Sequence, residues 1–530
     1  MSRQVFLLFV LLLAFVLPLA SLKANTISYT VTLLRSPFPM LKVAVKCPAQ
    51  KGSNYSRFYL SSGWSTVDEL ENEVHALRAF SHDGQELVVW RGARAGEKLE
   101  KDSWTVGKTK KESEEISLNY YLVPTRPAIT WQTRKRIVVG STFAHFTGGV
   151  ALLRPKHFAE TMSHKVSFKW QGFQEAGWKV ASTFSNKQEG FTVKRTLDEF
   201  AMATFMAGTL RVTEKTFRQG KVCCVLPGTR WNFGVEDFAS SALSIVKTTK
   251  HFMKEKAKSS LFIGVIPIAT KSPIPQGMAG LGLTESMLIF LQPDESLLWH
   301  PANDQRVMQV VAHEYLHQWF GGTIKPQRPT GYLIWFLEGF TDYYSLRMLL
   351  KASVIDKEGY VAAFNVLMEE YSKSPVRELS NHNIVLNYNR RFDVKRLPYL
   401  RGALLAAILD CKIRELTNGQ KRLDHMIYEM LQVSRKDTSM KWSTEDIFAA
   451  VRKFTNKEFE KQFRRYVVHG DLLPLPPRAL EPGMSFEVDR KYSPELARLL
   501  RIKTARHGGH RRGKDKKHRP EAFIPRLFLK

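Results

Sequence analysis

The chain has few cysteines, and the few it has do not form a disulfide framework. There are four in 530 residues, at Cys47, Cys223, Cys224 and Cys411. They are too few and too scattered to form the disulfide bonds that stabilise a small secreted domain. Cys223 and Cys224 are adjacent in an apolar run that we expect to be a strand, where neighbouring side chains point to opposite faces. We therefore interpret this pair as core residues and not as joint ligands of a metal ion.

Acidic residues are also in the minority, with 50 Asp and Glu against 79 Lys and Arg and a net charge of +29. Residues 491–530 hold 13 basic and three acidic residues. The run Arg506–Arg519 has almost no apolar content, and we expect residues 478–530 to form a basic, disordered tail. Such a tail suits an anionic membrane or envelope surface. We do not expect a nucleic-acid partner, because no aromatic and basic recognition module accompanies the tail.

Long apolar runs are rare, and the one that approaches a membrane span lies at the N-terminus. Arg3 precedes the run Val5–Leu22, which Pro18 interrupts. A basic residue followed by an apolar stretch is typical of a secretory signal, so residues 1–24 are a signal peptide or an uncleaved N-terminal anchor. The bulky Leu22 disfavours cleavage after Ala24, which keeps both alternatives open. Either one predicts an exported protein, periplasmic or extracellular, and the second also anchors it to the membrane.

The most informative segment is His313-Glu314-Tyr315-Leu316-His317, an HExxH motif in an apolar helical run. Burying two imidazoles and a carboxylate costs free energy unless something compensates them. Residues i and i+4 share one face of a helix, so His313 and His317 can bind one metal ion. Glu314 then lies beside the ion, where a general base for a metal-bound water is needed.

A second apolar helical run, Tyr332–Tyr344, carries Glu338 and Asp342 one turn apart. Catalytic zinc usually has three protein ligands and one open position. We therefore predict that Glu338 completes a site for one Zn²⁺ with the two histidines, and that Asp342 orients a ligand from behind. The alternative is a chance motif in an ordinary buried polar cluster.

The segments HEYLHQWFGG and WFLEGFTDYY resemble the gluzincin zinc aminopeptidases. In the alanyl and leucyl branch the second histidine and the glutamate lie closer together and a GAMEN-like segment lies upstream. Here 20 residues, 318–337, separate them and no GAMEN occurs. The phrase EGFTDYY and the order of segments over residues 27–475 are closer to the glycyl aminopeptidase family. The resemblance implies a zinc-dependent aminopeptidase that begins with a β domain.

The patterns along the chain predict an α+β multidomain fold. Short alternating strands over residues 25–182 predict an N-terminal β-sandwich-like domain. Residues 183–365 contain a strand, a glycine-rich edge, a second strand and the HExxH helix, the order of a thermolysin-like catalytic domain. Helical periodicity over residues 366–477 predicts an all-helical C-terminal domain.

The resemblance also implies a catalytic role for Tyr399. Pro398-Tyr399-Leu400-Arg401-Gly402 is similar to the PYxKG-type segment of these enzymes, in which the tyrosine stabilises the tetrahedral intermediate. Arg401 replaces the lysine of that segment and keeps its charge. The alternative is that Tyr399 is a core aromatic residue at the start of a helix.

The chain departs from the resemblance at substrate recognition. The family carries a GLEH-like segment whose glutamate holds the free amine of the substrate. Aligned on Ser286, this segment falls on Gly280-Leu281-Gly282-Leu283, so Gly282 stands where the glutamate is expected. Glu285 can replace that glutamate only if the loop is rearranged. The glycine-rich edge can still bind an extended peptide by strand addition.

The sequence therefore predicts a zinc metallopeptidase acting on peptides, with aminopeptidase activity as the first interpretation. One alternative is an endopeptidase that needs no free N-terminus, because the amine anchor is missing at Gly282. Another is a catalytically idle peptide-binding protein of the same fold. The intact HExxH motif, Glu338 and Tyr399 argue against the idle protein, since such a protein is expected to lose at least one of these polar groups.

Overall fold

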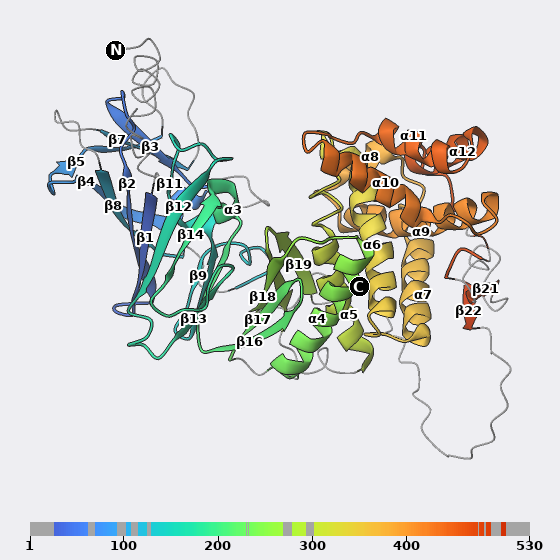
Figure 1. Ribbon diagram of the computed structural model, residues 1–530, viewed down its shortest axis with the longest axis horizontal. Helices are drawn as coiled ribbons and strands as arrows, with labels where there is room; N and C mark the ends of the chain where they lie inside the picture. Colours follow the sequence, from blue (N-terminus) through green and yellow to red (C-terminus); the bar gives the residue numbers. More distant parts are fainter. Residues whose placement is uncertain are drawn as a thin grey trace, which may run out of the picture.

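The computed structural model describes most of the chain between residues 26 and 504. The described ranges are 26–61, 69–92, 102–107, 115–124, 129–228, 231, 233–268, 278–292, 301–474, 476, 478–481, 484–488 and 500–504. The predicted signal segment 1–24 and the basic run Arg506–Arg519 lie outside them. Figure 1 shows a β-rich lobe on the left, a smaller sheet in the middle and a helical lobe on the right. No helix among the described residues is both long and apolar enough to cross a membrane.

The β-rich lobe confirms the predicted N-terminal β domain. A seven-stranded sheet and two four-stranded sheets share one apolar core. Every second residue is buried in β1 and β2, as alternation predicts for half-buried strands. The strands are β1 (Thr26–Leu34), β2 (Met40–Pro48), β3 (Tyr55–Tyr59), β4 (Val74–Ser81), β5 (Glu86–Leu87), β6 (Val89–Arg91), β7 (Ser103–Gly107), β8 (Glu115–Leu122), β9 (Val138–Val139), β10 (Phe143–Thr147), β11 (Arg154–Pro155), β12 (Ser163–Gln171), β13 (Lys179–Ser182), β14 (Phe191–Thr196) and β15 (Thr204–Gly208), with the short helices η2 (Leu70–Glu73), α2 (Gly148–Ala151) and α3 (Leu197–Ala201).

This lobe extends beyond residue 182, where the sequence led us to end it. β14 pairs with β12 in the large sheet, and β15 pairs with β10 and β13 in a second sheet. Because these pairings join strands far apart in the sequence, local patterns did not assign them. The first domain therefore reaches Gly208.

The middle layer is a five-stranded sheet in the order β16-β17-β18-β20-β19. Its elements are β16 (Leu210–Phe217), β17 (Gly220–Pro227), α4 (Val235–Phe252), β18 (Ser259–Pro267), β19 (Met278–Leu283), β20 (Ser286–Leu291) and α5 (Pro301–Leu316). β17, β18 and β20 are parallel, and β19 is an antiparallel strand at the end of the sheet. One face packs on helices and the other on the β-rich lobe. Cys224 belongs to the first core and Cys223 to the second, so the two side chains point apart.

The right-hand lobe is helical, as predicted. Its helices are η3 (Thr330–Leu333), α6 (Ile334–Lys351), α7 (Lys357–Lys373), α8 (Asn381–Asn387), α9 (Phe392–Leu416), α10 (Leu423–Lys436), α11 (Thr444–Phe454) and α12 (Lys457–Val468). Residue 365, the predicted end of the peptidase domain, lies inside α7, which packs against both α6 and α9. Helix α6, which carries Glu338, and the helices after it therefore share one continuous core.

Helices α6 and α9 cross with their backbones in contact. A Cβ atom built on Gly339 of α6 would overlap the Cα atom of Gly402 of α9. A Cβ atom on Gly402 would in turn overlap the carbonyl oxygen of Trp335. Only glycine permits this approach, and Glu338 of α6 and Tyr399 of α9 each lie within one helical turn of the crossing.

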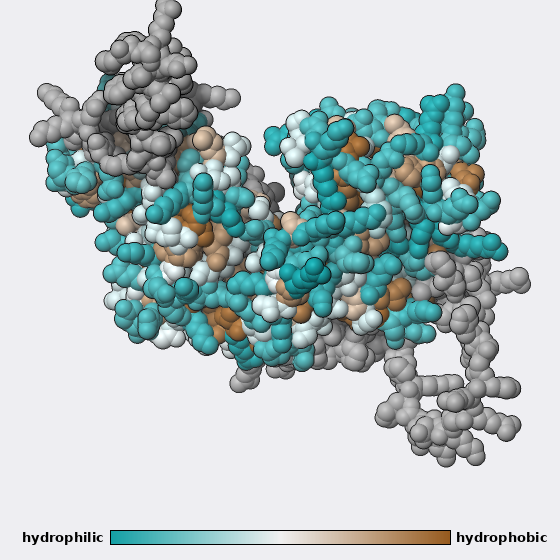
Figure 2. All heavy atoms as spheres, in the orientation of Figure 1, coloured by the Kyte–Doolittle hydropathy of each residue, from teal (hydrophilic) through white to brown (hydrophobic). Residues whose placement is uncertain are grey.

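Part of the segment predicted as a disordered tail is ordered. Ala479 and Leu480 are buried in the helical core, and Glu481 accepts hydrogen bonds from Arg347 and Arg422. β21 (Met484–Val488) and β22 (Leu500–Thr504) form a two-stranded antiparallel sheet. The predicted start of disorder at residue 478 is therefore too early, because composition does not reveal buried ion pairs with distant arginines. In the view of Figure 2 the surface is mostly hydrophilic, and the molecule is notched between the β-rich and helical lobes.

Candidate metal centre

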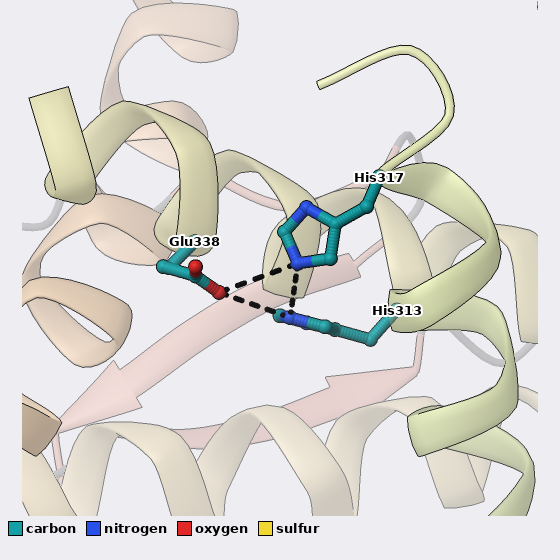
Figure 3. A group of neighbouring side chains, drawn as sticks. All are labelled: His313, His317 and Glu338. Atoms are coloured by element: carbon teal, nitrogen blue, oxygen red, sulfur yellow. Dashed lines mark hydrogen bonds and ion pairs between the residues drawn. The ribbon is translucent and has the colours of Figure 1, made fainter. Parts of the chain in front are cut away.

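Helices α5 and α6 bring three potential metal ligands to one point. The ligand atoms of His313, His317 and Glu338 all lie within 4.8 Å of one another, and Figure 3 shows the two rings and the carboxylate converging. Nε2 of His313 lies 3.0 Å from Nε2 of His317 and 3.2 Å from Oε2 of Glu338, and Nε2 of His317 lies 3.4 Å from the same oxygen. Three atoms that bind one zinc ion tetrahedrally at about 2.0–2.1 Å lie roughly 3.3 Å apart. The donor set therefore fits a zinc ion without rearrangement.

Each histidine is oriented through its other ring nitrogen. Nδ1 of His313 lies 2.7 Å from Oδ1 of Asp342, and Nδ1 of His317 lies 3.1 Å from the backbone oxygen of Phe320. Both oxygens accept, so Nδ1 donates in each ring and Nε2 can present its lone pair to a metal ion. The structure thus places Asp342 behind His313, where the sequence led us to expect a residue that orients a ligand.

The charges around the ligands favour a cation. Burial works to lower the pKa of His313, but Asp342 and Glu338 outweigh it and raise this pKa well above its usual range. Burial likewise works to raise the pKa of Glu338, but His317 and His313 outweigh it and hold this pKa far below its usual range. Both shifts arise because acidic and imidazole groups are packed together out of water. The point where they converge is therefore electrostatically negative and suited to a divalent metal ion.

Arg396 extends this arrangement behind Asp342, and the sequence did not point to it. Its guanidinium lies 3.6 Å from Oδ2 of Asp342 and pairs with Glu370 of α7 at 2.9 Å. A chain of charges thus runs from α7 through α9 and α6 to His313 on α5. The only sequence signal was a basic residue one helical turn before Tyr399.

Replacing Asp342 by Asn is expected to weaken zinc binding about 10- to 100-fold, the usual effect of losing a partner behind a ligand. An amide accepts the Nδ1 proton more weakly and removes one of the two carboxylates that face Arg396, the other being that of Glu370. Titration of the metal-free protein with Zn²⁺ in competition with a chelator measures the affinity. Asp437→Asn, which changes an exposed carboxylate, is the control. An unchanged affinity in Asp342→Asn would show that Asp342 does not position His313.

Glu314 lies between the ligands and the strand β19. A Cβ atom on Gly280 would overlap the carboxylate of Glu314, and one on Gly282 would lie 3.1 Å from its Oε2. Leu281, between them, packs instead against the core on the β-rich side. The two glycines therefore leave room for Glu314, and position 282 faces the site with no side chain of its own.

Glu285 is not available as the amine anchor. It occupies the turn between β19 and β20 with φ 54°, and its carboxylate pairs with Arg195 of β14 at 3.1 Å. This ion pair joins the five-stranded sheet to the β-rich lobe and holds Glu285 in place. The structure brings Gly280 and Gly282 to Glu314 but commits the Glu285 carboxylate to another partner.

Tyr399 lies over the metal ligands, and a second tyrosine accompanies it. Its ring stacks on His313 with the ring centres 6.0 Å apart and the planes at 19°. Burial and the charge of Glu338 raise the pKa of Tyr399, so its hydroxyl remains a donor. Tyr388 hydrogen bonds with Tyr399, and burial and Glu338 raise the pKa of Tyr388 to about 12. Sequence reasoning missed Tyr388, which stands alone between two asparagines and matches no motif.

A comparison with known protein families matches the segment that carries the candidate metal ligands. Residues 306–385 match the family model described as M61 glycyl aminopeptidase, and this segment contains the HExxH motif and Glu338. Over these residues the chain is similar to the glycyl aminopeptidase family. The matched segment is also the part of the chain in which the ligands were predicted.

Curated proteins match a limited part of this chain. Glutamyl aminopeptidase of Mus musculus is 28% identical over 157 residues, which are 27% of this chain and 16% of that protein. Glutamyl aminopeptidase of Homo sapiens is 26% identical over 191 residues, 34% of this chain and 19% of that protein. The match thus spans less than a fifth of the length of these relatives.

The fold of this chain is shared more widely than its sequence. The structure of an aminopeptidase N family protein from Idiomarina loihiensis superimposes with a TM-score of 0.68 at 16% identity. The match covers 87% of this chain and 79% of that one. The whole arrangement of β-rich lobe, five-stranded sheet and helices is therefore common to both.

Proposed function

We propose that this chain is a zinc-dependent metallopeptidase that removes residues from the N-termini of peptides. The observation that carries the proposal is the convergence of His313, His317 and Glu338 on one point, with Glu314 and Tyr399 on either side. The family match over residues 306–385 supports it. The fold shared with the Idiomarina loihiensis protein supports it further.

The residues of the site have different roles in the proposed hydrolysis. A zinc ion held by the three ligands would lower the pKa of a water molecule and polarise a peptide carbonyl. Glu314, partly exposed beside the ligands, takes a proton from the attacking water and passes it to the leaving amine. The protonated hydroxyl of Tyr399 donates to the oxygen on which negative charge develops.

The edge strand β19 is suited to hold the substrate. Among the described strands it has a neighbour on one side only, so its other backbone edge can pair with an extended peptide. Gly280 and Gly282 place one face of the same strand against Glu314. A peptide added to β19 would therefore lie beside the strand that contacts the general base.

Endopeptidase activity is the second candidate, because no carboxylate stands at Gly282 and Glu285 is bound to Arg195. We would measure zinc-dependent hydrolysis of short glycyl and alanyl peptides with free and with acetylated N-termini. Cleavage of free N-termini alone would establish an aminopeptidase. Cleavage of acetylated peptides as well would establish an endopeptidase. If neither class were cleaved, the proposal would fail and a peptide-binding protein would remain.

Export is part of the proposal. The signal-like residues 1–24 support a periplasmic or extracellular location, cleaved or anchored. The basic composition of residues 491–530 supports contact with an anionic membrane or envelope surface. Cell fractionation followed by N-terminal sequencing of the isolated protein would test the location, and cytoplasmic recovery of the intact chain would refute it.

A further inference from the structure

Three cationic residues line one pocket at the edge of the five-stranded sheet. The pocket has a volume of about 610 Å³ and is lined by Arg218, Gln219, Lys256 and Lys258. Arg218 and Gln219 lie in the turn between β16 and β17, and the two lysines lie in the loop between α4 and β18. All three cationic residues are exposed. The pocket is thus formed by two loops that carry charges of one sign, and it contains none of the residues assigned to hydrolysis.

The two loops are fixed to each other by Lys250, a fully buried residue in the last turn of α4. Its Nζ donates to the backbone oxygens of Ala257 at 2.7 Å and Gln219 at 3.4 Å. It also donates to Oγ of Ser259 at 2.7 Å. A Cβ atom on Gly220 would overlap the carbonyl oxygen of Ser259, so the two backbones are as close as glycine permits. Separating the loops would therefore break the hydrogen bonds of a buried ammonium group, which is costly.

The acidic residues beside the pocket are paired with other cations. Glu255, in the same loop as the two lysines, pairs with Arg435 of α10 at 3.3 Å. Glu214 of β16 pairs with Lys221 of β17 at 2.9 Å. Among the described residues, no carboxylate forms an ion pair with the three cations that line the pocket. Like charges held together without a counterion repel one another. Because the loops are fixed, an anion that enters the pocket relieves this repulsion more readily than a movement of the chain.

We propose that this pocket binds a terminal phosphate group. Such a group carries about 1.5 to 2 negative charges at neutral pH and offers three acceptor oxygens, so it can use several cations at once. The planar guanidinium of Arg218 suits two of these oxygens, and the ammonium groups of Lys256 and Lys258 act as point charges on the rest. The phosphate can belong to a lipid headgroup or to a soluble molecule. The inference is independent of the proposed function, because the pocket shares no residue with the metal centre.

Calorimetric titration of the full chain with inorganic phosphate tests the site. We expect saturable binding that weakens as added salt screens the charges. Arg218→Gln should weaken the affinity about 10- to 100-fold, the range for losing a hydrogen bond between charged groups. Arg218→Lys keeps the charge but not the planar fork, so its affinity should lie between the two. Lys179→Gln, which removes an exposed charge from β13, is the control, and phosphate bound at the metal centre or the basic tail would not respond to Arg218→Gln.

Vesicles separate the two sources of phosphate. Cosedimentation is measured with phosphatidylcholine vesicles that contain phosphatidic acid, whose headgroup is a terminal phosphate. The pocket variant carries three substitutions, Arg218→Gln, Lys256→Gln and Lys258→Gln. A control of equal net charge carries three on exposed lysines of the β-rich lobe, Lys165→Gln, Lys169→Gln and Lys179→Gln. A loss of vesicle binding confined to the pocket variant would assign a lipid headgroup. Equal vesicle binding by both variants, with loss of inorganic phosphate in the pocket variant alone, would assign a soluble phosphate.

Two results would overturn the inference. One is the absence of phosphate binding in the titration, or binding by Arg218→Gln as tight as that of the unaltered chain. The other is binding of polyglutamate, but not of phosphate, that the pocket variant loses, which would assign an acidic polypeptide instead. Thermal unfolding of each variant checks the fold, and it should be unchanged because the three side chains are exposed. Peptide hydrolysis should likewise proceed at the unaltered rate, so a failure of the proposed function does not affect this test.

Discussion

Glu314→Gln is expected to lower kcat for peptide hydrolysis by about 10²- to 10⁴-fold, the usual contribution of a general base. The amide has nearly the shape of the carboxylate but cannot take up the proton of the attacking water. The three ligands are unchanged, so zinc content should stay the same. Hydrolysis rates at saturating substrate, together with metal analysis of the same samples, measure both quantities.

The matched control for this variant is Glu358→Gln, which changes an exposed glutamate in the first turn of α7. It should hydrolyse peptides at the unaltered rate. Loss of zinc in Glu314→Gln would mean that Glu314 also supports the ligands. Full activity with zinc retained would exclude Glu314 as the base, and the proposed chemistry with it.

Tyr399→Phe is expected to lower kcat by about 10²- to 10³-fold, the range for removing one donor to a developing oxyanion. KM and zinc affinity should change little, because the phenyl ring can keep the stacking on His313. Steady-state kinetics on the variant, with zinc affinity from chelator competition, separate these effects. A fall confined to KM would show that Tyr399 binds substrate without stabilising the intermediate.

Tyr388→Phe is the informative comparison, since it removes the neighbouring hydroxyl of the pair. Tyr388 holds Tyr399 through a hydrogen bond, so its loss should cost less than the loss of Tyr399 itself. If Tyr388→Phe proved the more damaging change, Tyr388 would be the donor and Tyr399 its support. The double variant would then behave like Tyr388→Phe alone, because both hydroxyls serve one step.

The position of Tyr399 beside the metal ligands depends on two glycines. Gly339 and Gly402 let α6 and α9 approach until their backbones touch, and Glu338 and Tyr399 lie within one turn of that crossing. The sequence shows both glycines within the segments EGFTDYY and PYLRG. Glycine is required at both positions, however, because two helices that lie far apart along the chain are in contact there.

The sequence alone was sufficient wherever the relevant geometry is local. The four-residue spacing of His313 and His317 places both on one helix face whatever the tertiary fold. The same holds for Glu338 and Asp342 on α6. Alternation in β1 and β2, and apolar periodicity after residue 366, likewise predicted the β-rich and helical parts. These patterns depend on repeat distances of three to four residues or of two.

Sequence reasoning was less successful wherever partners come from different parts of the chain. It ended the first domain at residue 182, although β14 and β15 pair back into its sheets. It placed Ala479, Leu480 and Glu481 in a disordered tail, although they pack against the helical lobe. Strand pairing and buried ion pairs between distant residues leave no periodic signal, so composition dominated these predictions.

The sequence by itself determined the type of site, because an HExxH helix followed by an apolar helix with an acidic residue specifies the ligands and the base. Only the tertiary structure decided the surroundings of that site. It paired Glu285 with Arg195 and brought Tyr388 to Tyr399. The physical reason is that ligand spacing is a property of one helix, whereas the charge around the ligands is summed over every element packed near them.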